Sequence, residues 1–218
     1  MFIGHHAVGF AAKRFAPKVS LGWLMAAPLL PDLLCALFII LGIEHVGSPL
    51  HAGPYLRMGP GDYPWSHSLA MNLAYALLFA GLYFALRKDR RGAIVLAIGV
   101  LSHYLLDWIT HLPDVPIVPG SPGLGLGLWK SFWGTLSIEG LGFLAATNDY
   151  FRVTRARDRF GSIGAGLFVA FLAAIYVAYL ALPGTGNSDR VAWLGLASVG
   201  LFVWVAAFDR HREPRVVA

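Results

Sequence analysis

The sequence predicts an all-α fold, a polytopic membrane bundle of about six spanning helices with a short N-terminal helix. Two observations lead to this prediction. Of the 218 residues, 57% are hydrophobic and 13% are charged, whereas a soluble domain usually carries about 25% charged residues. The apolar residues are gathered into runs of roughly 20, the length that a helix needs to cross a bilayer. The basic residues lie between these runs, so we read the net charge of +5 as a topology signal and expect no nucleic-acid partner.

The predicted spans follow one another with short connections. Pro28 and Pro31 should kink or break the first span, and Ser66 can cap the second. The Pro- and Gly-rich stretch 113–127 should form an ordered or interfacial loop rather than a helix. The six spans lie near residues 19–43, 67–86, 93–112, 131–150, 161–182 and 191–208.

We expect one integral membrane domain over residues 1–218. Within it, residues 1–18 form an N-terminal amphipathic or re-entrant segment, residues 19–150 form the core with the polar site, and residues 151–218 contain two C-terminal spans. The single cysteine, Cys35, excludes an intramolecular disulfide and a thiolate zinc cluster.

The basic residues predict the orientation of the spans. In the six-span arrangement, 14 of the 17 Lys and Arg residues fall on one side of the membrane, in residues 1–18, 87–91, 152–159 and 210–215. Cytoplasmic loops carry an excess of Lys and Arg. Both termini are therefore predicted to be cytoplasmic.

The segment LSHYLLDWITHLP at 101–113 contains the clearest chemical signal. His103, Asp107 and His111 are spaced at i, i+4 and i+8, so they project from one face of a helix. An Asp near the centre of a spanning helix costs roughly 2.5–3.5 kcal/mol on insertion scales, so the row should have a compensating partner. Imidazole and carboxylate ligands suit a divalent metal, and zinc is our first choice.

Other ionisable residues fall at a similar depth, in the outer half of the membrane. Asp32 lies about 20 Å along the first span, and the row in the third span lies at roughly 15–27 Å. His67 begins the second span at its outer end, and Glu139 enters the fourth span from the outside. We therefore predict one polar pocket that opens away from the cytoplasm.

Each of these residues also has a simpler explanation when taken alone. A histidine at a helix end, such as His67 or His111, is often an interfacial residue. Asp32 could cap a broken helix, and Glu139 could bond to a hydroxyl group of a neighbouring helix. Asp32, His67 and Glu139 together with the third-span row favour a metal site over these separate explanations.

Several further residues are weaker candidates. Asp62 and the hydroxyl groups of Ser66 and Ser68 could support the ligands from a second layer. His5 and His6 could join the pocket only if residues 1–12 fold back into the bundle, and spacing alone leaves both out. His211 in the basic tail is expected to be solvated. The weakest candidates are Glu44, His45, His51 and Asp114.

Four motifs in this order resemble those of the membrane-bound metal-dependent hydrolase family of bacterial inner-membrane proteins. The resemblance covers roughly the first 140 residues and implies location in the bacterial inner membrane. It implies that His5, Asp32, His67, His103 and Asp107 are ligands, and it supports His5 over His6. The motifs are GHHA at 4–7, PLLPD at 28–32, WSHSL at 65–69 and LSHYLLDWITH at 101–111.

The same order of residues is similar to that of the soluble zinc-dependent phospholipase C and P1 nuclease group, which hydrolyses phosphoesters at a multi-zinc site. This similarity is an analogy at the level of the fold and establishes no activity. The sequence departs from the membrane family at GDYPW (61–65), where many members have an HRG-type triplet, and at Leu33 and Leu34, where an acidic or His pair often follows. The number of metal ions and the substrate therefore stay open.

The leading functional hypothesis is a membrane-embedded metal-dependent hydrolase, a phosphoesterase that acts on a lipid or lipid-linked substrate through a metal-activated water. An amphipathic substrate suits a pocket inside the lipid bilayer. Glu139 would be a ligand or general base, and Asp62 would support catalysis. The expected metal ligands are His5, Asp32, His67, His103, Asp107 and His111.

Two other hypotheses are kept. Intramembrane His, Asp and Glu residues also mark the pathways of ion or proton-coupled transporters, which would distribute such groups through the full membrane depth. A non-catalytic membrane scaffold would use the same polar groups only to join helices, and it would tolerate a substitution such as His103→Gln without loss of folding.

Overall fold

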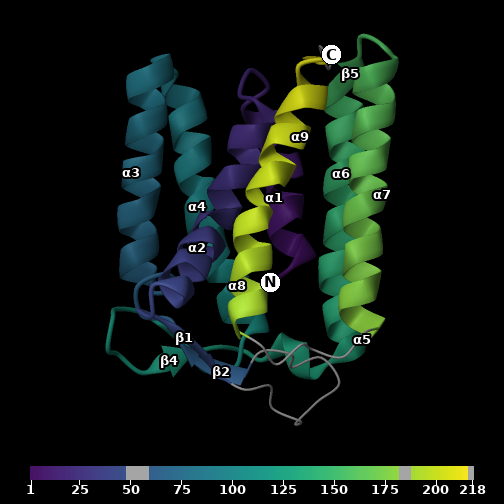
Figure 1. Ribbon diagram of the computed structural model, residues 1–218. Coiled ribbons are helices and arrows are strands. Elements are labelled where there is room, and N and C mark those ends of the chain that lie inside the picture. The colour runs from purple at the N-terminus through teal and green to yellow at the C-terminus, as the bar shows by residue number, and fades with distance from the viewer. Residues whose placement is uncertain (48–58, 182–187, 216–218) are drawn as a thin grey trace.

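The computed structural model is a bundle of helices with small two-stranded sheets at its ends (Figure 1), and it describes residues 1–47, 59–181 and 188–215. The all-α membrane fold predicted from the sequence is confirmed. Within the described residues, five helical stretches are long and apolar enough to cross a membrane. They are α2 (Leu21–Ile40), α3 (Leu69–Arg87), α4 (Arg90–Thr110), α7 (Arg159–Ala181) and the stretch Asp189–Asp209, which α8 (Ser188–Ala197) and α9 (Val199–Asp209) form together.

The stretch predicted as the fourth span is helical, but it is built from three consecutive pieces. An α-helical turn α5 (Phe132–Thr135) leads into a π-helical turn η2 (Leu136–Gly140), and α6 (Leu141–Val153) continues from it. At 1.5 Å per residue, residues 132–153 are together about 33 Å long. The π turn contains Glu139, and single π turns inside α-helices are frequent at functional sites.

The first helix, α1 (Ile3–Phe15), lies inside the bundle. It packs against α2, α4 and α6, and Figure 1 shows the N-terminus partway along the bundle and the C-terminus at one end of it. Gly9 allows the close approach of α2, because a Cβ atom at this position would lie 3.0 Å from the Cα atom of Met25. The N-terminal segment thus occupies the interior, the re-entrant arrangement that the sequence left open.

The two prolines of the first span do not break it. The helix α2 runs from Leu21 to Ile40 through both Pro28 and Pro31. The carbonyl oxygen of Pro28 bonds to a group outside α2, because it accepts a hydrogen bond from the His103 ring at 2.8 Å.

Two small antiparallel sheets close one end of the bundle (Figure 1). β1 (His45–Gly47) pairs with β2 (Gly59–Asp62), and β3 (Val115–Pro116) pairs with β4 (Gly123–Leu124). A 3-10 turn η1 (Leu128–Lys130) connects the second sheet to α5. Position 125 must be a glycine, because a Cβ atom there would lie 2.1 Å from the carbonyl oxygen of Leu112.

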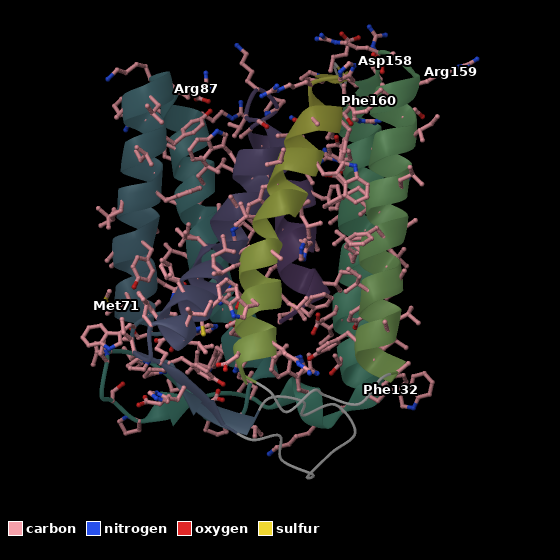
Figure 2. The ribbon with its side chains drawn as sticks, viewed as in Figure 1. Met71, Arg87, Phe132, Asp158, Arg159 and Phe160 are labelled. Atoms are coloured by element: carbon pink, nitrogen blue, oxygen red, sulfur yellow. The ribbon has the colours of Figure 1, made fainter. Side chains whose placement is uncertain are left out.

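The opposite end of the bundle carries charged loops and the third sheet, in which β5 (Thr154–Ala156) pairs with β6 (Arg212–Pro214). Figure 2 shows Arg87, Asp158 and Arg159 at this end and Met71 and Phe132 at the other. The structure therefore gathers the basic loops at one end, which the positive-inside rule predicts to be the cytoplasmic one.

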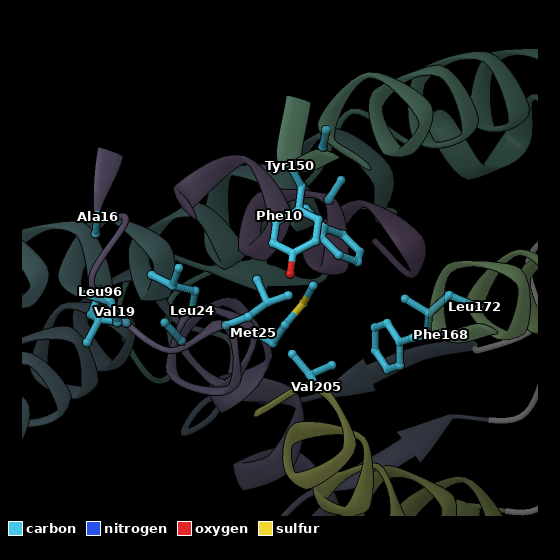
Figure 3. Packing of buried hydrophobic residues seen from close by; sticks show 14 of the residues in the cluster. Phe10, Ala16, Val19, Leu24, Met25, Leu96, Tyr150, Phe168, Leu172 and Val205 are labelled. Carbon is cyan, nitrogen blue, oxygen red and sulfur yellow. The ribbon is translucent and has the colours of Figure 1, made fainter. Parts of the chain in front are cut away.

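The hydrophobic core surrounds α1. Phe10 is fully buried, and its ring lies 5.2 Å from that of Tyr150 and 6.2 Å from that of Phe168. Figure 3 shows Met25 and Val205 beside this group. The ring contacts of Phe10 join α1 to α6 and α7, and Gly9 lies against Met25 of α2, so apolar packing positions the middle of α1.

Candidate metal centre

Asp107, on α4, is the centre of a cluster of buried imidazole rings. We use the name Asp107 cluster for His5, Asp32, His67, His103, Asp107 and His111. Four Nε2 atoms face the two carboxylate oxygens of Asp107: those of His103 at 2.8 Å, His5 at 3.1 Å, His67 at 3.5 Å and His111 at 3.8 Å. Five of the six ligands expected from the sequence are thus close together, and the sixth, Asp32, lies beside His67 and His103.

Several elements position these side chains. His103 and Asp107 are one helical turn apart on α4, and His111 is the residue that ends this helix. Its amide still donates to the Asp107 carbonyl at 2.7 Å, so the row continues on the same face. His5 comes from α1, where its ring stacks on that of His103 with centroids 4.2 Å apart. His67 lies just before α3.

Asp32, on α2, is the sixth member of the cluster and the one whose side chain is exposed. Its Oδ1 atom lies 3.5 Å from Nε2 of His67 and 3.9 Å from Nε2 of His103. Its side chain is 45% exposed, whereas those of the other five members are at most 6% exposed. A molecule from outside would therefore reach the cluster at Asp32.

The donor atoms form two groups of three, His5–His103–Asp107 and Asp32–His67–His103, and within each group all atoms lie within 4.8 Å of one another, close enough to share one metal ion. Around the ring Asp32–His67–Asp107–His103, neighbouring donor atoms are separated by 3.5, 3.5, 2.8 and 3.9 Å. Ligands 2.0–2.2 Å from a tetrahedral zinc ion lie about 3.4 Å apart. The four residues come from three separate segments of the chain, and of the four distances only that between His103 and Asp107, one turn apart on α4, is set by helix geometry.

The orientation of two rings also fits ligation. Nδ1 of His103 must donate to the Pro28 carbonyl at 2.8 Å, because a carbonyl oxygen only accepts. In a neutral ring, Nε2 then carries a lone pair. This Nε2 has no hydrogen-bond partner among the described residues, although it is fully buried. Nδ1 of His111 lies 3.1 Å from Oδ1 of Asp114, which orients that ring in the same way.

Glu139, in the π turn η2, lies against the first residues of α1 and binds their backbone amides. Its Oε2 atom accepts hydrogen bonds from the amides of Phe2 and Ile3 at 3.0 Å each, and its Oε1 atom accepts one from the Trp129 indole at 3.2 Å. The Trp129 ring in turn packs on the His111 ring, with centroids 4.4 Å apart. The Glu139 carboxylate thus holds both α1 and a neighbour of His111. The amino group of Met1 contacts Asp107 next to His5.

The other expected residues lie in different places. Asp62 is exposed on β2, where its backbone pairs with His45. Ser68 caps α3 by accepting from the Met71 amide at 3.4 Å. His6 is buried, and its Nε2 atom has no hydrogen-bond partner within the described part of the chain. His51 lies outside the described residues.

His211 differs from the sequence expectation, because it is not simply solvated. Its Nδ1 atom pairs with Asp158 at 2.6 Å at the charged end of the bundle. The Gly161 amide and the His211 ring both bind this carboxyl group, and they lower the pKa of Asp158.

Of two further residues beside the Asp107 cluster, sequence reasoning ranked Glu44 low and did not single out Asn72. Glu44, only a weak candidate, is 1% exposed and binds Ser66 next to His67. Asn72 is fully buried, and its amide group donates to the carbonyls of Ser66 and Ser68 at 2.9 and 3.0 Å. The signal for Asn72 was available, since a polar residue one turn inside a spanning helix needs a partner.

A family model described as YdjM inner membrane protein matches residues 1–212 of the chain. No curated protein gives a significant match, and no solved structure does. The match covers the Asp107 cluster and nearly all of the bundle.

Proposed function

The chain belongs to the YdjM inner membrane protein family, and from the geometry of the Asp107 cluster we propose that it is a membrane-embedded metal-dependent hydrolase. The metal is a divalent cation, with zinc as first choice, and the substrate is a phosphoester in a lipid or lipid-linked molecule. The family supports location in the inner membrane. The metal and the reaction are our inference from the Asp107 cluster.

One observation carries the proposal: four imidazole Nε2 atoms converge on a single buried carboxylate. Buried polar groups are normally satisfied by hydrogen bonds; within the described part of the chain Nε2 of His103 makes none of normal geometry, although Oδ2 of Asp107 lies 2.8 Å from it. A metal ion would accept lone pairs from the two imidazoles of one donor group and offset the charge of its acid. It therefore offsets the cost of burying these groups, which helix-to-helix hydrogen bonds would offset only in part.

The chemistry of the donor set supports hydrolysis. Zinc held by imidazole and carboxylate ligands supplies an activated water at neutral pH. The residues of the chain provide the rest: the stacked His5 and His103 rings exclude bulk water from one side, and the exposed Asp32 carboxylate lies where a substrate would enter. Glu139 holds α1, and with it His5, against the cluster.

The surroundings support an amphipathic substrate. The cluster lies among helices whose outer faces are apolar, such as α3 with the exposed Leu77, Leu78 and Leu82. A lipid or lipid-linked phosphate could place its polar group at Asp32 while its chains stay in the membrane.

The transporter alternative is less well supported. A proton or ion path would need polar groups along the bundle beyond the cluster. Between His6 and Lys13, the buried residues of α1 are Ala7, Gly9 and Phe10, so this central helix offers no polar step across roughly two turns.

Metal analysis of the detergent-purified protein tests the proposal. We expect stoichiometric zinc in the wild type and its loss in Asp107→Ala, followed by zinc-dependent release of phosphate or head group from lipid substrates. Glu213→Gln is the control, because this exposed carboxylate lies at the other end of the bundle. A wild type that binds no metal and is as stable as Asp107→Ala would remove the metal site. Bound zinc without any hydrolysis of phospholipids or lipid-linked phosphates would remove the hydrolase.

A further inference from the structure

Glu44, Ser66 and His67 form a buried chain of hydrogen bonds that ends at the Asp107 cluster. Their exposed fractions are 1%, 0% and 5%. Oγ of Ser66 lies 2.6 Å from Oε2 of Glu44 and 2.7 Å from Nδ1 of His67. The proposed hydrolysis uses His67, but it gives no role to Glu44.

The direction of these hydrogen bonds follows from the donors available. A carboxylate only accepts, so the single hydroxyl proton of Ser66 is donated to Glu44. The Ser66 oxygen can then only accept from His67, which requires a proton on Nδ1. A neutral ring with this proton carries its lone pair on Nε2, and this atom lies 3.5 Å from both Asp32 Oδ1 and Asp107 Oδ2.

The orientation of Glu44 is itself fixed. The amides of Trp65 and Ser66 both donate to Oε1 of Glu44 at 2.8 Å. This oxygen is therefore committed to the backbone, and Oε2 is the atom that remains for the Ser66 hydroxyl.

We infer that Glu44 is a positioning residue, which acts through Ser66 to hold His67 in the tautomer that can ligate a metal. The inference rests on the proposed metal site and adds a residue to it. Partners behind a ligating histidine fix its tautomer, and their loss typically weakens metal binding 10- to 100-fold. His103 uses a backbone carbonyl and His111 uses Asp114 directly, so His67 is the ligand with a hydroxyl relay that can be reversed.

The substitution Glu44→Gln should reverse the relay without changing its shape. The Gln oxygen must stay at the two backbone amides, so its NH₂ group would face the Ser66 hydroxyl. Ser66 would then accept from Gln and donate to Nδ1 of His67. The proton of the neutral ring would move to Nε2, where it blocks the lone pair from the metal.

The experiment measures the zinc dissociation constant by chelator competition for the wild type, Glu44→Gln, Ser66→Ala and the double variant. We expect Glu44→Gln to weaken zinc binding 10- to 100-fold and Ser66→Ala to weaken it about tenfold. The double variant should match Ser66→Ala, because without the hydroxyl group the Gln cannot act on His67. Size-exclusion profiles and thermal unfolding identify any variant that fails to fold, and Glu213→Gln is the control for a lost carboxylate.

A purely structural role for Glu44 would give a different pattern. The Ser66→Ala variant keeps its backbone amide at this position, so Glu44 would still support residues 65 and 66, and the two losses would multiply. Multiplied losses, or wild-type affinity in Glu44→Gln, overturn the relay while zinc binding by the wild type stands. Should Glu44→Gln fail to fold, unchanged affinity in Ser66→Ala overturns it. If the double variant matches Ser66→Ala but the wild type hydrolyses no lipid substrate, the positioning role of Glu44 is supported and the hydrolase proposal is rejected. If the wild type binds no zinc, both proposals are rejected.

Discussion

Two buried ionic clusters lie near opposite ends of α1, and they are built differently. The Lys13 cluster consists of Lys13, Tyr150 and Asp209. Lys13 donates to Asp209 at 2.6 Å and to the Val19 carbonyl at 2.9 Å, while Asp209 also accepts from the Leu21 amide at 2.8 Å and from Tyr150 at 3.1 Å. One cation thus faces one anion, and both oxygens of the carboxylate are bound.

The Asp107 cluster has no such balance. Four imidazole rings and the Met1 amino group face two carboxylates, and among the described residues Nε2 of His103 makes no hydrogen bond of normal geometry although Oδ2 of Asp107 lies 2.8 Å from it. A buried ion pair needs good geometry and bound lone pairs to offset its desolvation, and the Lys13 cluster meets both conditions. The comparison suggests that the Lys13 cluster holds α1 in place, whereas the Asp107 cluster offers more imidazole donors than its acids can pair with.

The largest expected effect separates folding from metal binding. Lys13→Met leaves Asp209 buried without its cation, and breaking a buried pair in this way typically costs about 3–5 kcal/mol. We expect this loss in denaturant unfolding in detergent, with zinc still bound to the folded fraction. Arg14→Met is the matched control, since the neighbouring Arg14 pairs with Asp149 at the surface and should change stability little. Equal stability of the two variants would contradict the structural role of the Lys13 cluster.

Zinc removal should act on the Asp107 cluster alone. At free zinc 100 times its dissociation constant, binding to the native state stabilises it by about 2.7 kcal/mol. Chelation should therefore lower the unfolding free energy of the wild type by this amount and leave Asp107→Ala unchanged. The measurement is thermal or denaturant unfolding with buffered zinc. If the stability of the wild type does not depend on zinc, the Asp107 cluster has a structural role, like the Lys13 cluster, and does not bind zinc.

Glu139→Gln should show how far the position of α1 depends on the hydrogen bonds between Glu139 and the first amides of this helix. The wild-type carboxylate accepts from two amides and from the Trp129 indole, so the NH₂ group of Gln must face a donor on one side. A buried donor left unsatisfied costs about 1–3 kcal/mol. We expect this loss of stability together with weaker zinc binding, because His5 is carried by α1. If zinc binding weakens without any loss of stability, Glu139 acts on the metal rather than on the helix.

The smallest effect is expected at the charged end of the bundle. Glu213 pairs with Arg155 and Arg157 at the surface, and the Arg155 guanidinium lowers the pKa of Glu213. Exposed pairs of this kind contribute little because water and salt screen them. Glu213→Gln should leave both the unfolding midpoint and the zinc affinity unchanged, and a clear shift in either would mean that this end is coupled to the interior.

Part of the site could be predicted from spacing. His103, Asp107 and His111 could be placed together because four-residue steps return to the same helix face. Asp32 and His67 could be placed at a similar depth because the rise per residue is constant. His5 could not be placed by either argument, because a cytoplasmic segment and a re-entrant helix have the same local pattern. Packing of Phe10 and Gly9 and the Lys13 cluster decide between them.

The sequence by itself determined the fold class, the apolar stretches and most of the imidazole and carboxylate residues that the Asp107 cluster brings together. These properties depend on composition and on helical periodicity, both of which are local. Tertiary structure alone decided that α1 enters the bundle, that Glu139 binds its first amides, and that Glu44 reaches Ser66 across more than 20 residues. These contacts join segments far apart in the chain, and their formation depends on how whole helices pack, which no local pattern specifies.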